Sequence, residues 1–263
     1  MNKQPLLFIG HGSPMNAIQS NIYTESWKNL WLSLSEPRAI VIFSAHWITE
    51  WETRISSAKS PEMIYDMYGF PLELYRFQYK ISGSPEIAEN IYTSLIRAFP
   101  EKYISLDGSR WIDHGIWSTL AHIFPEGHVP VISVSLDYQA SSDYLFSLGK
   151  ALSYLRDEGV LFIASGNIVH NLRAIDWSWT HIYDWAKEFD QKVANSIENR
   201  DYNQLLDFKN WWDISQLAHP SYDHLLPLFP LLGMVDETDS VDFLTPDIVM
   251  GSLSMRSVRW SSL

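Results

Sequence analysis

Residues 6–14 read Leu-Leu-Phe-Ile-Gly-His-Gly-Ser-Pro, a short apolar run that passes directly into a turn. The run has the length of a buried strand, and the two glycines and the proline favour a tight turn immediately after it. His11 lies inside this turn. The segment therefore predicts a core strand that brings a histidine to one edge of a sheet.

Further apolar runs, rich in β-branched residues, also have the length of buried strands. They are Ala39–Phe43, Val129–Val134, Val160–Ala164 and Ile248–Leu253. Between the runs lie patterns with the apolar spacing of helices, several of which begin near Ser, Thr or Asp. These are Tyr23–Leu34, Glu86–Phe99, Ile116–Ile123, Ala140–Arg156 and His181–Glu198. Strands that alternate with helices predict an α/β fold with three layers, α/β/α, around a largely parallel or mixed sheet.

The chain shows no linker composition that would divide it, so we expect residues 1–263 to form a single catalytic domain. The stretch from Thr49 to Gly83 is rich in Tyr, Pro, Met and Gly and has weak periodicity. It is interpreted as an extended loop or small hairpin region, and long irregular segments of this kind often cover functional sites.

Composition excludes several classes of function. With 19 Lys and Arg against 31 Asp and Glu, the net charge of −12 disfavours nucleic acid and anionic lipid as partners. The absence of cysteine excludes disulfides, thiolate metal sites and cysteine nucleophiles. No apolar segment has the length of a signal-peptide core or a membrane span, so we expect a cytoplasmic protein with no membrane segment. The oligomeric state stays unknown.

Histidines recur at the ends of the predicted strands. His46 ends the run that begins at Ile40, and His170 follows the run Val160–Ala164 by a few residues. Open α/β folds place their ligand crevice at the carboxyl ends of the strands, so His11, His46 and His170 are expected at one rim. Neutral imidazole binds Zn²⁺ or Fe²⁺, and three such ligands leave room for water or substrate. The spacing matches no compact metal motif, and a single such histidine is more often structural.

His114 lies in Asp113-His114-Gly115, directly before a predicted apolar helix. A helix start can orient a catalytic group, and Asp113 has two possible roles there. It fixes the tautomer of His114, or it caps the helix; the sequence leaves both open. His122, His128 and His181 are assigned to structural or surface positions.

Several segments together resemble the class III extradiol ring-cleavage dioxygenases, and within them the 4,5-DOPA dioxygenase-like branch. The segments are Gly-His-Gly-Ser-Pro-Met-Asn at 10–16, Ser-Ala-His-Trp at 44–47, Ala-Ser-Gly-Asn-Ile-Val-His-Asn-Leu at 164–172, and Ala218-His219-Pro220 leading to His224 and Pro227. Further similarity runs through residues 68–71, 113–115 and 250–255. The resemblance spans nearly the whole chain.

The resemblance implies an enzyme that opens the ring of a catechol such as DOPA, inserting both atoms of O₂ to give a semialdehyde. Its partners would be a small aromatic diol and O₂. It also implies that His11, His46 and His224 hold one divalent metal. His170 would lie beside the metal as acid/base, substrate contact or additional ligand, and His114 would contact dioxygen or substrate.

The identity of the metal is left open by one departure from the family. Relatives that cleave protocatechuate complete their metal triad with a glutamate, whereas the matching element here offers His224. A site with three histidines suits Zn(II) as well as iron. Fe(II) is expected for dioxygenase chemistry, because zinc cannot exchange electrons with O₂, although Zn(II) is a plausible bound metal.

Two alternatives from other classes use the same residues. A zinc-dependent hydrolase would attack an amide or ester with metal-bound hydroxide. An interaction scaffold would keep the fold without turnover. Oxygen consumption separates the dioxygenase from both.

Overall fold

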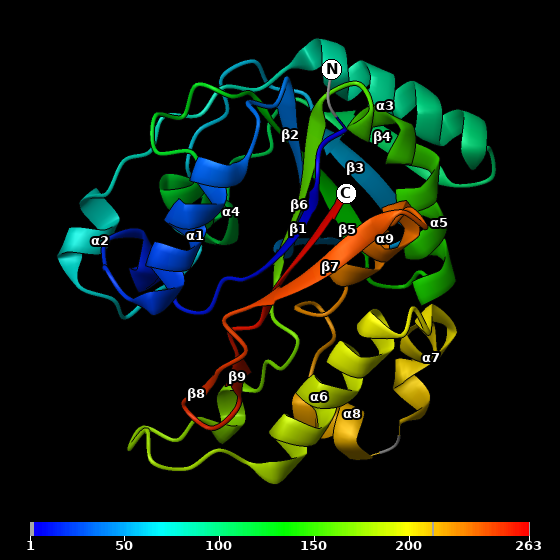
Figure 1. The fold of residues 1–263 in the computed structure, drawn as a ribbon. Helices are drawn as coiled ribbons and strands as arrows, with labels where there is room; N and C mark the ends of the chain where they lie inside the picture. Colours follow the sequence, from blue (N-terminus) through cyan, green and yellow to red (C-terminus); the bar gives the residue numbers. More distant parts are fainter. Residues whose placement is uncertain (1–2, 212, 263) are drawn as a thin grey trace.

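A twisted sheet of eight strands forms the centre of the computed structural model, which describes residues 3–211 and 213–262 (Figure 1). The order across the sheet is β4-β3-β5-β2-β6-β1-β10-β7. In that order the strands are Tyr103–Asp107, Glu52–Ser56, Val131–Asp137, Ala39–Thr49, Val160–Gly166, Leu6–Gly10, Ser257–Ser262 and Asp239–Leu244. The four middle strands, β5, β2, β6 and β1, are parallel, whereas β3 is antiparallel to β5 and β10 is antiparallel to both β1 and β7.

Helices cover both faces of the sheet (Figure 1). In chain order they are α1 (Ile22–Ser33), α2 (Leu72–Arg76), α3 (Pro85–Ala98), α4 (His114–Ile123), α5 (Ser142–Leu152), α6 (Asp184–Glu198), α7 (Tyr202–Leu206), α8 (Asp213–Ala218) and α9 (Leu228–Met234). Alternate residues of β1 enter opposite cores, because successive side chains of a strand point to opposite faces. Leu6 and Phe8 pack in the core with α3, α5 and α9, and Leu7 and Ile9 pack in the core with α1 and α4. The predicted three-layer α/β/α class with a mixed sheet is confirmed.

One predicted strand is wrong. Residues 248–253 were expected to form a single buried core strand, but Ile248–Val249 (β8) and Leu253–Ser254 (β9) pair with each other as a separate two-stranded sheet. Met250 and Gly251 between them have positive φ values of 49° and 79°, so the chain reverses there. Beyond β1, the main sheet is completed by β10 and β7. The sequences of these two strands mix polar and apolar residues and contain no apolar run.

The stretch from Thr49 to Gly83 is irregular only in part. Its first residues form β3 within the main sheet, and α2 lies near its end. Between them, backbone hydrogen bonds from Ile64 to Ile112 and from Ile112 to Glu62 hold an extended segment next to the start of α4. Among the described residues, no helix is both long and apolar enough to cross a membrane.

Candidate metal centre

Two histidines meet at the carboxyl edge of the sheet. His11 is the first residue after β1, and its side chain is buried. His46 lies in β2, two residues beyond the last β2–β6 pair, Ser44 with Ser165. The register between β2 and β5 shifts between Phe43 and Ile48, and this irregularity frees the strand around His46 from regular pairing. The Nε2 atoms of His11 and His46 are 3.3 Å apart.

His224 completes the group from a different part of the chain. It lies in the turns between α8 and α9, and it is buried. One ring nitrogen from each of His11, His46 and His224 falls in a group whose members all lie within 4.8 Å of one another. Two nitrogens that bind one Zn²⁺ or Fe²⁺ ion at roughly 2.0–2.1 Å lie about 3 Å apart. The spacing of His11 and His46 already fits shared coordination of a metal.

Hydrogen bonds fix which nitrogen of each ring is free. Ser165 Oγ donates to the carbonyl of Gly115 at 2.7 Å, so it accepts from His11 Nδ1 at 3.0 Å. The carboxylate of Asp223 accepts from His224 Nδ1 at 3.0 Å. Both rings therefore carry their proton on Nδ1 and offer the Nε2 lone pair, as is usual when a neighbouring group orients a metal-binding histidine.

The electrostatics favour uncharged rings. Burial, followed by the neighbouring imidazoles, lowers the pKa of both His11 and His224 well below the ordinary value for histidine. Burial and the nearby His114 lower the pKa of His46 to about 4. Neutral imidazole is the form that binds a metal, so the cluster needs no deprotonation near neutral pH to accept one.

His114 is positioned by Asp66, a residue far away in the sequence. His114 is the first residue of α4, and its ring centroid lies 3.9 Å from that of His46. Asp66 Oδ1 accepts from the backbone N–H of His114 at 3.0 Å and from its Nδ1 at 2.9 Å. Burial opposes ionisation of Asp66, but the hydrogen bond from His114 outweighs it and lowers the pKa of this carboxyl to about 2.

Asp113 takes neither of the two roles left open by the sequence. It makes no capping hydrogen bond with its side chain. Its carboxylate instead accepts from Ser44 Oγ and from Arg110, each at 2.7 Å. Because Asp66 binds both the backbone N–H and Nδ1 of His114, it performs the capping and the tautomer selection together.

His170 lies against the metal cluster rather than inside it. Its ring stacks on that of His224 with centroids 3.4 Å apart and planes 3° from parallel. Its backbone N–H donates to the carbonyl of Ala218 at 3.0 Å, which ties the segment after β6 to the end of α8. Burial lowers the pKa of His170 to about 3. The structure thus brings together His11, His46, His114, His170 and His224.

The histidines assigned to structural or surface positions lie elsewhere. His122 contacts the carbonyl of Asn16 through Nε2 at 2.6 Å, and His128 lies 3.1 Å from Glu36. His181 is exposed.

Three groups that support the site were not predicted from the sequence. Ser165 lies in the segment 164–172 and Asp223 lies next to His224, so the sequence indicates that both are close to the site, but it does not indicate their hydrogen bonds. Asp66 had only an indirect signal, its place in the irregular stretch expected to cover a site.

Comparisons with known proteins identify the family of the chain. Residues 6–255 match the family model described as the catalytic LigB subunit of aromatic ring-opening dioxygenase. The chain belongs to this family. The LigB family assignment confirms the resemblance drawn from the sequence and the enzyme class expected from it, an extradiol aromatic ring-opening dioxygenase.

Two relatives match this LigB-family chain over nearly its full length. A 4,5-DOPA dioxygenase extradiol of Escherichia coli K12 is 37% identical, over 98% of this chain and 94% of the relative. A protein of the same name from Beta vulgaris is 32% identical, over 99% and 98%. The crystal structure of an uncharacterized E. coli K12 protein superposes with a TM-score of 0.83 at 33% identity, covering 98% of this chain and all of that one.

Proposed function

We propose that this LigB-family enzyme is a metal-dependent extradiol dioxygenase that cleaves a catechol, with DOPA as the first substrate to test. The convergence of the His11, His46 and His224 nitrogens within 4.8 Å carries the proposal. The names of the relatives from E. coli and Beta vulgaris support the choice of DOPA. We further propose that residues 1–263 act as one catalytic domain, and that the enzyme is cytoplasmic.

His11, His46 and His224 would hold one divalent metal. Fe(II), when bound, supplies the electron exchange with O₂ that ring cleavage requires; Zn(II), which the same nitrogens also suit, does not. Three protein ligands leave positions open for substrate and O₂. Elemental analysis of the purified protein identifies the metal that these three histidines hold.

His114 and His170 would move protons. Because His114 donates its Nδ1 proton to Asp66, its Nε2 is free to take a proton from a catechol hydroxyl, and Asp66 stabilises the resulting cation. His170, uncharged against His224, would act as the second acid/base, taking the proton of the other catechol hydroxyl and returning it to the product oxygen. A positioned acid or base contributes roughly 10²–10⁴ in rate.

The test is oxygen uptake by protein reconstituted with Fe(II) under anaerobic conditions and then mixed with aerated catechols. The semialdehyde product is followed by its absorbance. We expect uptake with stoichiometric product from the wild type and none from His46→Ala, while His128→Ala, a surface histidine outside the cluster, keeps full activity. Uptake that survives in His46→Ala would refute the assigned site.

The comparisons favour this proposal over a zinc hydrolase or a scaffold without turnover. Absence of uptake across the panel, together with metal-dependent hydrolysis of esters or amides, would reverse that preference.

A further inference from the structure

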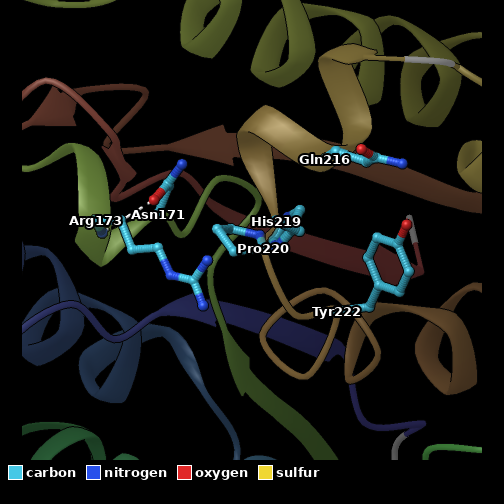
Figure 2. A pocket seen from close by; sticks show the side chains of 6 residues that line it. All are labelled: Asn171, Arg173, Gln216, His219, Pro220 and Tyr222. Carbon is cyan, nitrogen blue, oxygen red and sulfur yellow. Dashed lines mark hydrogen bonds between the residues drawn. The ribbon is translucent and has the colours of Figure 1, made fainter.

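A polar pocket lies beside the metal cluster and is not used by the mechanism above. Its volume is about 460 Å³, and six residues line it: Asn171, Arg173, Gln216, His219, Pro220 and Tyr222 (Figure 2). Arg173 and Tyr222 approach from opposite sides of His219 and Pro220 (Figure 2). The pocket is therefore built from two segments, the one that follows His170 and the one that leads to His224.

Residues that line the pocket are neighbours, in the chain, of residues at the proposed catalytic site. His170 donates its backbone N–H to Ala218, and its ring stacks on His224. Asn171 follows His170 in the chain, and His219 follows Ala218. A second bond, from Asn171 Nδ2 to the carbonyl of Leu217 at 2.7 Å, holds the same two segments together. After burial, the neighbouring His219 is among the groups that lower the pKa of both His170 and His224, so the pocket lies near the proposed site.

His219 offers an unused hydrogen-bond acceptor. Its side chain is 1% exposed, and Nε2 donates to the carbonyl of Ile168 at 2.7 Å. That bond leaves a lone pair on Nδ1, which has no hydrogen-bond partner among the described residues. The Nδ1 atom itself is buried. Leaving a buried polar atom without a partner costs about 1–3 kcal/mol, so a ligand donor that reaches Nδ1 after a small shift of its neighbours would recover that cost.

Arg173 offers an unused positive charge. It is exposed at the pocket, and no carboxylate of the described residues forms an ion pair with it. In a chain with a net charge of −12, an arginine without an acidic neighbour is well placed for an anionic ligand. The guanidinium binds a carboxylate best, through two parallel hydrogen bonds.

We propose that this pocket binds the α-amino-acid end of the catechol substrate, with Arg173 holding its carboxylate and His219 Nδ1 accepting from its ammonium group. The proposal rests on the proposed function and deepens it, because it selects catecholic amino acids over simple catechols. Gln216 and Tyr222 add neutral polar groups at the pocket rim.

The test compares four catechols that differ only at the end of the side chain. DOPA carries ammonium and carboxylate, 3-(3,4-dihydroxyphenyl)propionate only the carboxylate, dopamine only the ammonium, and 4-ethylcatechol neither. For Arg173→Gln, we expect the ratio of kcat/KM for DOPA to that for 4-ethylcatechol to fall about tenfold. The ratio should be unchanged in Arg97→Gln, an exposed arginine of α3 that loses the same charge. An equal ratio in Arg173→Gln and wild type would overturn the proposal.

A binding measurement separates this proposal from the dioxygenase proposal. L-Tyrosine carries the amino-acid end but lacks the diol, so its calorimetric binding needs no turnover. We expect Arg173→Gln to weaken that binding about tenfold relative to wild type and Arg97→Gln, and removal of the ammonium in 3-(4-hydroxyphenyl)propionate to weaken it as well. If the wild type binds tyrosine and both changes weaken the binding, the proposed role of the pocket is supported even if no catechol is cleaved. No binding of tyrosine to the wild type, or equal binding to Arg173→Gln, overturns it.

Discussion

Asp66 is the residue through which a distant segment controls the site. It binds His114 at two atoms and also lies 3.7 Å from His46 Nδ1 through its second oxygen. In the proposed mechanism Asp66 does not itself contact substrate, so its effect passes through the imidazoles of His114 and His46. It is therefore a positioning residue, which holds His114 in one tautomer and one orientation.

Asp66→Asn should lower kcat by about 10²-fold or more with little change in KM, because the amide stabilises the His114 cation poorly and permits the wrong tautomer. Metal content after reconstitution should stay close to wild type, since the change spares all three proposed ligands. Asp143→Asn, an exposed residue at the start of α5, is the matched control. A loss of bound metal in step with activity would instead make Asp66 part of the metal site.

Helix α4 approaches the sheet closely at Gly115, and this contact supports the site at the scale of elements. A Cβ atom at residue 115 would lie 2.9 Å from His46 Cδ2, 3.1 Å from Ser44 Oγ and 3.2 Å from Ser165 Oγ. The carbonyl of Gly115 also accepts from Ser165, the residue that orients His11. Absence of a side chain at 115 therefore lets one helix position two of the proposed ligands.

Gly115→Ala should weaken metal binding by about 10–100-fold, the usual effect of disturbing groups that orient ligands. The measurement is competition with a chromophoric chelator after removal of metal. Gly108→Ala serves as control, because its added Cβ would meet only Ser57 Oγ at an ordinary 3.8 Å. Unchanged metal affinity in Gly115→Ala would mean that His46 can shift without cost.

At the scale of the whole molecule, a buried ion pair connects the antiparallel edge to the parallel centre of the sheet. Arg156, just before β6, binds both oxygens of Asp239 at 2.6 and 3.0 Å, and Asp239 begins β7. The guanidinium also donates to the carbonyls of Gln4 and Met234. The network joins segments that are far apart in the chain.

Asp239→Asn should lower the free energy of unfolding by roughly 3–5 kcal/mol at pH 7, because it leaves Arg156 charged and buried without its partner. Urea unfolding measures this, with Asp184→Asn, which removes an exposed pair with Lys187, as a control expected to change stability little. If the two variants were equally stable, the buried pair would contribute nothing beyond an exposed one.

The Arg156–Asp239 pair also predicts how the free energy of unfolding depends on pH. Burial alone would raise the pKa of Asp239, but the hydrogen bonds from Arg156 and the backbone of Asp236 lower it overall. A carboxyl with a lowered pKa in the folded state contributes its full stability above the unfolded pKa of about 3.9, and loses it as the pH falls through the folded value. The stability difference between wild type and Asp239→Asn should therefore shrink in strong acid.

The sequence by itself determined the layers of the fold and the residues of the cluster. Apolar runs predicted β1, β2, β5 and β6 because strands buried on both faces have no polar alternation. His11 and His46 were expected together because parallel strands end at one edge. Strand β7 was missed because it is a half-exposed edge strand, and β10 was missed because its sequence, Ser-Val-Arg-Trp-Ser-Ser, has no apolar run although it lies between β1 and β7. The hairpin of β8 and β9 was misread because the turn at Met250 and Gly251 depends on backbone geometry rather than on an apolar pattern.

Only the tertiary structure decided what surrounds the histidines. Asp66 reaches His114 across 48 positions of the chain, and Ser165 reaches His11 across 154, so no local pattern could relate them. Asp113, adjacent to His114 in sequence, points instead to Ser44 and Arg110. The pocket between Arg173 and His219 likewise exists only where two segments are bound together. Residue types and strand ends are local properties of a sequence, whereas hydrogen-bond partners and cavities depend on how distant segments pack.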